Sequence, residues 1–138
     1  MRKYLGLDVG DVRIGVSKSD PMGILATPLE VINRNEKDPV KRIAEILIQE
    51  KTKKIVVGLP KSLDGTVKRQ VEKVNEFIAE LNSKIDDLEI FMVDERYSTV
   101  EAEHYLRNYS KRNPRERRQV VDMVAATIIL QKFLDMGK

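Results

Sequence analysis

The chain has 138 residues, of which 41% are hydrophobic and 34% are charged, and its formal net charge is +3. This length suits one ordinary domain, so we expect a single domain over residues 1–138 with its own core. The lack of cysteine excludes disulfide frameworks and thiolate metal sites, and the single histidine excludes imidazole clusters. No apolar run is long enough to cross a bilayer, and the N-terminus enters a strand pattern directly, so we expect a cytoplasmic protein without a membrane partner.

The first predicted element is a β-hairpin in the sequence YLGLDVGDVRIGVS, residues 4–17. We expect a two-residue turn with Gly10 at the position where a type II′ turn needs a positive φ. One face of this hairpin is then apolar: Leu5, Leu7, Val9, Val12, Ile14 and Val16. The other face pairs Asp8 with Arg13, Gly6 with Gly15 and Tyr4 with Ser17. The two glycines leave that second face bare, so a backbone, a helix or a ligand can approach it closely.

The remaining elements alternate between strand and helix patterns. Their order is an edge strand over 24–32, a helix from Asp38-Pro39, a buried strand over 54–58, a helix over 67–81, a strand over 88–96, a short helix from Ser98, and a last helix from Asn113-Pro114 to Gly137. This order predicts an α/β fold with a five-stranded mixed sheet, in which a three-strand antiparallel meander continues into parallel strands with helices on both faces. The arrangement resembles the ribonuclease H-like (RNase H-like) fold.

An aspartate interrupts the apolar stretch of the last helix. Asp122 stands two turns inside the helix, too far along for capping, and Ala125 and Ala126 follow one turn later. We expect these small residues to pack on the glycine-bare face of the hairpin, which would bring Asp122 towards Asp8.

Glu95 is the third candidate carboxylate, because it stands at the carboxyl end of a strand, where sites are built in parallel sheets. The strand between those of Asp8 and Glu95 should end at Gly58, which leaves room for Glu95 to reach across. Three carboxylates favour a hard cation, Mg²⁺ or Mn²⁺, and two such ions can activate water and stabilise the leaving oxygen in phosphodiester cleavage. Asp94 stays open as an alternative to Glu95, since neighbouring strand residues point to opposite faces.

Each of these carboxylates also has a structural explanation. Asp8 could simply pair with Arg13 across the hairpin, Glu95 and Asp94 could solubilise a loop, and Asp122 could pair with Arg96 or Arg118. The site interpretation is favoured because Asp8, Glu95 and Asp122 all fall on the same predicted edge of the sheet.

Basic residues gather between positions 107 and 118, where six cations accompany the single acid Glu116. They are Arg107, Lys111, Arg112, Arg115, Arg117 and Arg118. Such a segment could follow a phosphate backbone, and the alternative is a solvated helix face and loop.

Four motifs together resemble the YqgF (RuvX) family over nearly the whole chain. They are GLDVG with Arg13 and Gly15, VGLP with Gly65, DER with Ser98-Thr99, and Asp122 with Ala125 and Ala126. The resemblance implies a cytoplasmic RNase H-like protein with metal-dependent nuclease chemistry at the positions of Asp8, Glu95 and Asp122. Both Holliday junction DNA and the 5′ end of pre-16S ribosomal RNA are proposed substrates of the family.

Further expectations concern nucleic acid and oligomeric state. Arg13, Arg96 and the basic segment would hold phosphates that flank the cleaved bond. A resolvase of a two-fold symmetric junction would act as a homodimer, whereas a nuclease of an RNA precursor could act as a monomer.

Two other classes of protein compete with the nuclease. A phosphotransferase of the actin, Hsp70 and sugar-kinase type has a phosphate loop like GLDVG, but it needs two lobes and this chain has room for one. A catalytically silent RNase H-like module that binds nucleic acid is the second rival. The presence of all three carboxylates argues against that module.

Overall fold

The computed structural model describes residues 2–59, 65–94 and 114–136, and these ranges hold five strands and three helices. In chain order they are β1 (Leu5–Val9), β2 (Arg13–Ser19), β3 (Ala26–Asn33), α1 (Pro39–Glu50), β4 (Lys54–Leu59), α2 (Gly65–Lys84), β5 (Glu89–Asp94) and α4 (Pro114–Met136). The helix predicted from Ser98 lies outside the described residues. None of the described helices is both long and apolar enough to span a membrane.

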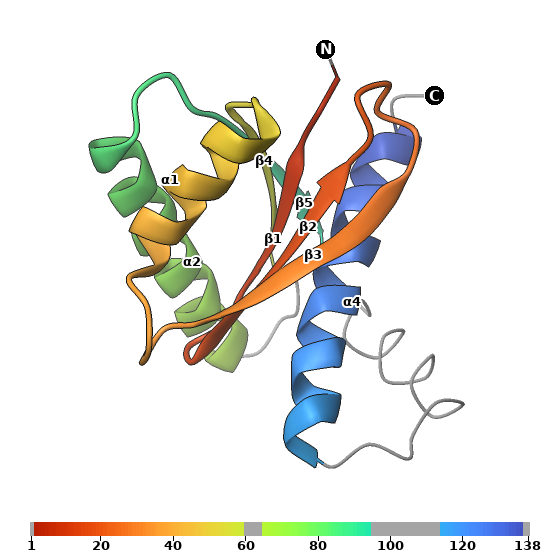
Figure 1. Ribbon diagram of the computed structural model, residues 1–138. Helices are drawn as coiled ribbons and strands as arrows, with labels where there is room; N and C mark the ends of the chain where they lie inside the picture. The colour runs from red at the N-terminus through yellow and green to blue at the C-terminus, as the bar shows by residue number, and fades with distance from the viewer. Residues whose placement is uncertain (1, 60–64, 95–113, 137–138) are drawn as a thin grey trace.

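The strands form one mixed sheet in the order β3-β2-β1-β4-β5 (Figure 1). The first three strands are antiparallel neighbours, and β4 pairs parallel with both β1 and β5. Pro28 lies in β3 at the edge of the sheet, where its missing N–H removes no bond from a central ladder. The predicted α/β fold and the predicted strand topology are therefore confirmed.

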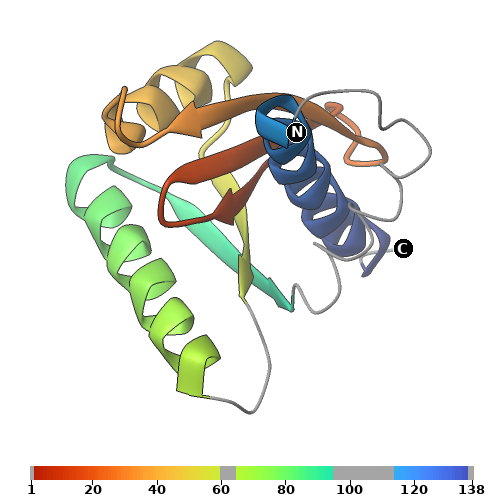
Figure 2. The ribbon, with the colours of Figure 1, turned by 90° about the horizontal axis from the view of Figure 1, so that it is seen from below.

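Helices cover both faces of this sheet, as predicted (Figures 1 and 2). α1 and α2 pack on one face, which we call the α1/α2 face, and their core consists of large aliphatic residues and Phe77. α4 packs on the other face, the α4 face, where a second apolar cluster forms around the C-terminal half of the helix. An aromatic cluster of Tyr4, Phe91 and Phe133 borders this second cluster, with ring centroids 5.1 to 5.9 Å apart.

Two helices begin where the sequence predicted. Asp38 caps α1 by accepting from the backbone N–H of Val40 at 3.1 Å, and Pro39 occupies the first helical position. α4 begins at Pro114, although its predicted cap Asn113 lies outside the described residues.

The hairpin register differs from the prediction by two residues. Gly10, Asp11 and Val12 connect the strands, and the Gly10 N–H donates to the Arg13 carbonyl at 3.0 Å. Gly10 does not have the positive φ of a type II′ turn; a Cβ there would instead lie 2.6 Å from the Arg13 carbonyl oxygen. The longer loop pairs Asp8 with Gly15 rather than with Arg13.

A shift of two residues keeps every paired side chain on its predicted face, because side chains alternate with a period of two. Leu5, Leu7, Ile14 and Val16 are buried in the α1/α2 core, as predicted. Val12 is the exception: it belongs to the loop and is exposed.

Candidate active site

The middle of α4, from Asp122 to Leu130, packs against the glycines of the hairpin. A Cβ added to Gly15 would overlap the backbone of Asp122, so only glycine allows the helix to lie this close to β2. A Cβ on Gly6 would lie 2.9 Å from the Ala126 carbonyl oxygen and 2.8 Å from the Leu130 Cβ. The predicted packing of small helix residues on the glycine-bare face is therefore confirmed.

A serine hydroxyl also joins β2 to the helix. Ser17 is fully buried, and its hydroxyl donates to the Ala126 carbonyl oxygen at 2.8 Å. A buried hydroxyl needs such a partner, because leaving it unsatisfied costs about 1–3 kcal/mol. The hydrogen bond and the glycine contacts together determine where α4 lies along β2. Only a weak signal pointed to this role in advance: a polar residue on the hairpin face that carries the glycines.

Asp122 lies directly over the residue that pairs with Asp8. Gly15 pairs with Asp8 across the hairpin, and the same glycine touches the Asp122 backbone. Asp8 and Asp122, which are far apart in the sequence, are thus brought to one place on the α4 face. Both residues are half-buried.

Arg13 forms an ion pair with Asp122. Its Nε donates to the Asp122 Oδ2 at 2.6 Å, and the two side chains are 28% and 20% exposed. Burial raises the pKa of Asp122 above the ordinary value of an aspartate, while the hydrogen bond and charge of Arg13 oppose that rise. Arg96 and Arg118 were the partners expected for Asp122, and the side chains of both lie outside what the structure describes. Arg13 is a partner that was not expected, because the predicted register paired it with Asp8.

The strand predicted to separate the first and third carboxylates is β4. It pairs with β1 as far as Leu7 and Val57, and Gly58 is the next residue along β4. On its other side β4 pairs with β5, with Leu59 beside Asp94 at the end of the ladder. Glu95 comes one residue later and lies outside the described residues, as does Arg96.

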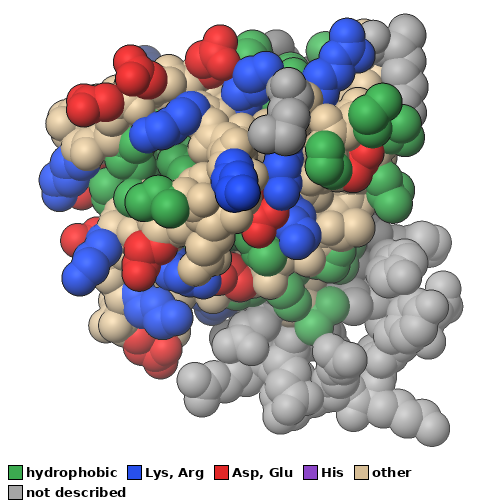
Figure 3. All heavy atoms as spheres, turned by 45° about the horizontal axis from the view of Figure 1, so that its top comes forward, with side chains coloured by type: hydrophobic (Ala, Val, Ile, Leu, Met, Phe, Trp, Pro, Cys, Tyr) green, Lys and Arg blue, Asp and Glu red, His purple; other side chains and the backbone are tan. Residues whose placement is uncertain are grey.

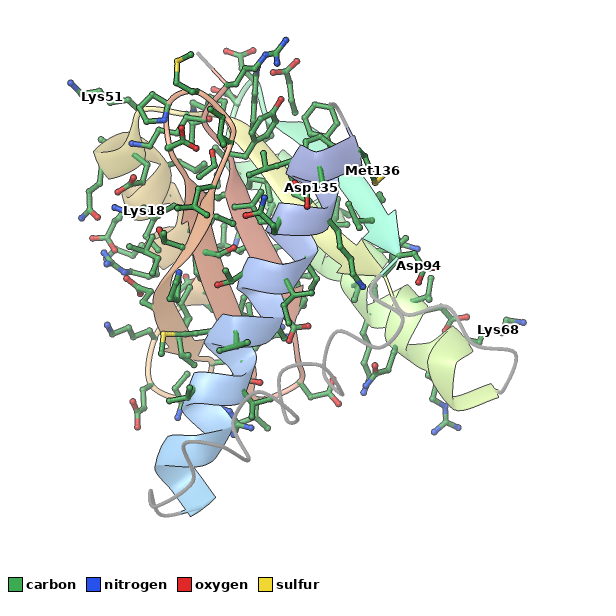
Figure 4. The ribbon with its side chains drawn as sticks, turned by 90° about the vertical axis from the view of Figure 1, so that its right-hand side faces the viewer. Lys18, Lys51, Lys68, Asp94, Asp135 and Met136 are labelled. Atoms are coloured by element: carbon green, nitrogen blue, oxygen red, sulfur yellow. The ribbon has the colours of Figure 1, made fainter. Side chains whose placement is uncertain are left out.

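Asp94 belongs to the α1/α2 face of the sheet, away from Asp8. Val93 packs in the cluster beneath α4, and side chains alternate along a strand. Leu59, the residue paired with Asp94, packs against the α1/α2 core. Figure 4 shows Asp94 at the end of β5. Alternation therefore argues against Asp94 as a substitute for Glu95.

The tip of the hairpin is held on its other side by α2 and by the residue that follows β3. Arg34 donates from Nη1 to the Gly10 carbonyl at 2.8 Å and stacks 5.2 Å from the centroid of Phe77. Lys73 of α2 forms an ion pair with Asp11 at 3.2 Å. The Arg34 contact holds the loop next to Asp8 and Arg13, whereas the pair of Lys73 with Asp11 is exposed and contributes little.

The structure only partly covers the predicted basic segment. Arg115, Arg117 and Arg118 belong to the first turns of α4, whereas Arg107, Lys111 and Arg112 lie outside the described residues. Elsewhere charges of both signs are interspersed, as Figure 3 shows for the surface around the N-terminal end of β1. There Lys3 and Lys18 both lie within ion-pair distance of Glu50, at 3.0 and 3.8 Å.

Within residues 2–59, 65–94 and 114–136, no group of three or more His, Asp or Glu side chains is arranged to hold a metal ion. The predicted trio cannot be assembled from these ranges, because Glu95 falls between two of them. The described part of the site thus consists of two carboxylates, Asp8 and Asp122, and the arginine paired with Asp122.

Comparisons with known proteins agree with this architecture. Residues 2–136 match the RuvX family, described as a Holliday junction resolvase. A protein of Fusobacterium nucleatum subsp. nucleatum with the name "Putative pre-16S rRNA nuclease" is 57% identical over 138 residues, which are 100% of both chains. A protein of Desulforamulus reducens with the same name is 47% identical over 137 residues, which are 98% of both chains.

Two solved structures share the fold at low sequence identity. RuvC of T. thermophilus in complex with a Holliday junction substrate has a TM-score of 0.55 and 15% identity, over 98% of this chain and 95% of that one. The Fowlpox virus resolvase in complex with Holliday junction DNA has a TM-score of 0.57 and 8% identity, over 98% of each chain. The likeness to RuvC confirms the RNase H-like fold.

Proposed function

Because this chain belongs to the RuvX family, we propose that it is a metal-dependent nuclease that hydrolyses phosphodiester bonds. The observation that carries the proposal is the packing of Asp122 over Gly15, the residue paired with Asp8. Neither capping nor the helix dipole explains an aspartate at this depth in α4. A place beside a second carboxylate is what a nuclease of this fold would need.

The donor atoms fit a hard divalent cation. Asp8 and Asp122 offer carboxylate oxygens, which suit Mg²⁺ or Mn²⁺ better than softer metals. We propose that Glu95 completes the set, since it directly follows the last residue of β5. Cations bound by these three carboxylates would supply Lewis acidity for the attack of water on phosphorus and for the departure of the leaving oxygen.

The residues of the chain itself have two tasks in this proposal. The carboxylates on β1 and α4, held together by Gly15, set where the reacting phosphate lies. The basic residues Arg96, Arg107, Lys111, Arg112, Arg115, Arg117 and Arg118 would hold flanking phosphates by charge and hydrogen bonds.

The substrate we favour is precursor 16S ribosomal RNA, because relatives that match this chain over nearly its full length carry that name. Four-way DNA junctions are the second candidate, because the family itself is described as a Holliday junction resolvase. Junction cleavage would call for a homodimer, whereas RNA cleavage could proceed in a monomer. With either substrate, we propose that the protein acts in the cytoplasm.

The test is cleavage by wild-type protein and the Asp8→Asn variant. Labelled unstructured single-stranded RNA, RNA with the pre-16S 5′ end, and a four-way DNA junction are each incubated with Mn²⁺, Mg²⁺ or EDTA. We expect metal-dependent cleavage by the wild type, and cleavage by Asp8→Asn no faster than in EDTA, while nucleic-acid binding persists.

Asp11→Asn is the matched control for this experiment. Asp11 is an exposed carboxylate of the same hairpin, and it pairs with Lys73 on the side of α2. This variant should cleave like the wild type. Binding without cleavage of any substrate would instead favour the catalytically silent module, and loss of both activities in Asp8→Asn would make Asp8 a structural residue.

A further inference from the structure

We propose that Arg13 is a positioning residue for Asp122 and not, as its place in the sequence suggested, a contact to nucleic-acid phosphate. The inference rests on the proposed function, because it takes Asp122 as a metal ligand. Its basis is the hydrogen bond of 2.6 Å from the Arg13 Nε to the Asp122 Oδ2, between two half-buried side chains.

One strand holds both the backbone and the side chain of Asp122. Arg13 and Gly15 are alternate residues of β2 and share a face of the sheet. Gly15 touches the Asp122 backbone, which fixes the position of that residue relative to Asp8. Arg13 then fixes the direction in which the Asp122 carboxylate points.

The hydrogen bond is compatible with a metal at the same carboxylate. It uses Oδ2, and an ionised carboxylate has two oxygens with about four lone-pair sites, so Oδ1 can face a cation. Carboxylates that bind metals are usually held by an outer hydrogen-bond donor. Removing such a donor typically weakens metal binding by about 10–100-fold.

The same ion pair argues against a phosphate contact. The positive charge of Arg13 is already compensated by Asp122, so it would release few counterions from a nucleic acid. A true phosphate contact has a measurable signature, because each contact to a single strand contributes about 0.7 to the slope of log K against log salt concentration.

The first experiment measures Mn²⁺ binding by the loss of the free-Mn²⁺ EPR signal, with no substrate present. Wild-type protein is compared with Arg13→Ala, Arg13→Lys and Asp122→Asn. We expect Arg13→Ala to weaken Mn²⁺ binding by about 10–100-fold. Arg13→Lys should weaken Mn²⁺ binding less than Arg13→Ala, because lysine keeps the positive charge. Some loss should remain, because lysine lacks the planar fork of arginine.

Arg42→Ala is the matched control, because Arg42 forms the corresponding ion pair on the other face of the sheet. Its Nε and Nη2 donate to Glu30 at 2.9 and 2.6 Å, and the two side chains are 23% and 22% exposed. Breaking this pair removes an arginine of similar burial far from Asp122. Mn²⁺ binding by Arg42→Ala should stay within about twofold of the wild type. That change is small compared with the loss of about 10–100-fold expected for Arg13→Ala.

The second experiment measures binding to single-stranded RNA in EDTA over a series of salt concentrations. We expect the same salt slope for wild type and Arg13→Ala. A slope smaller by about 0.7 in the variant would identify Arg13 as a phosphate contact and overturn the inference.

The outcomes separate this inference from the proposed function. If the wild type binds Mn²⁺, Asp122→Asn weakens binding and Arg13→Ala does not, the metal site stands and the inference is wrong. If the wild type binds no Mn²⁺, the proposed metal site is wrong and the inference falls with it. Should Arg13→Ala fail to fold, Arg13→Lys decides through its smaller expected loss: Mn²⁺ binding weaker than that of the wild type supports the inference, and unchanged Mn²⁺ binding overturns it.

Discussion

The two faces of the sheet are built from different kinds of residue. On the α1/α2 face, leucine, isoleucine and valine side chains from the strands meet those of α1 and α2 in a continuous apolar core. On the α4 face, the middle of α4 lies against Gly6, Gly15 and Ser17, which contact mainly the helix backbone. Among the side chains of α4 that the structure describes, those of its second half form the contacts with large apolar residues.

This difference separates stability from positioning. Large buried side chains supply most of the free energy of folding, because each removes much apolar surface from water. Small residues bury little area, but they let a helix backbone approach a strand and so place a helix side chain within reach of a strand side chain. On the α4 face, small residues replace large apolar ones at the place where Asp122 lies near Asp8.

The largest effect should follow from adding bulk at Gly15. In Gly15→Val the side chain would overlap the Asp122 backbone, and a backbone cannot move aside as a flexible side chain can. We expect a loss of stability of about 3 kcal/mol or more, together with loss of Mn²⁺-dependent cleavage. Urea denaturation and the cleavage assay measure the two effects. A stable variant with normal cleavage would contradict the close packing of α4 on β2.

A smaller effect should follow from removing bulk on the other face. Ile43 is fully buried in the α1/α2 core, and Ile43→Val deletes one methylene group. We expect a loss of stability of about 0.5–1.5 kcal/mol in urea denaturation, with the rate of cleavage by the folded protein unchanged. If the fully folded variant cleaved more slowly than the wild type, packing on the α1/α2 face would also affect the site on the α4 face.

The smallest effect concerns the β2–β3 loop, which docks on α4. The Asp20 carboxylate accepts from the N–H groups of Leu25 and Ile24 at 2.8 and 2.7 Å, and these bonds lower its pKa below the ordinary 3.8. A lowered pKa stabilises the folded loop above pH 3.8, and that stabilisation is lost as the pH falls through the pKa of the folded state.

NMR titration of the Ile24 and Leu25 amide resonances measures this effect. In the wild type we expect both resonances to move only below pH 3.8, and in Asp20→Asn we expect no titration in that range. Movement of both amides around pH 5 in the wild type would contradict the lowered pKa.

Sequence patterns predicted the elements and their faces, because an error of two residues in register leaves each side chain on the same face of the sheet. The turn at Gly10 was wrong in type and length, yet Asp8, Gly6 and Gly15 lie on the predicted face, since a shift of two residues preserves it. The position of Asp122 on this face was predictable from its place beside Ala125 and Ala126 in the last helix.

The pairing of Arg13 with Asp122 was not predictable in this way. The two residues are 109 positions apart, and nothing local to either one names the other. A shift of two residues in the hairpin was enough to give Arg13 a different partner from the one expected. Long-range polar contacts depend on the register of the strands and on the position of the helix along them. The periodicity of a sequence predicts neither of these.

The distance in sequence between Arg13 and Asp122 also has a consequence during synthesis of the protein. At about 5–20 residues per second, roughly 5–20 s pass between the addition of Arg13 and the addition of Asp122. The strands of the hairpin leave the ribosome long before the helix that completes their polar face. A chain that stalls before α4 therefore carries Asp8 without Asp122, and under the proposed function it would be inactive until the helix is added.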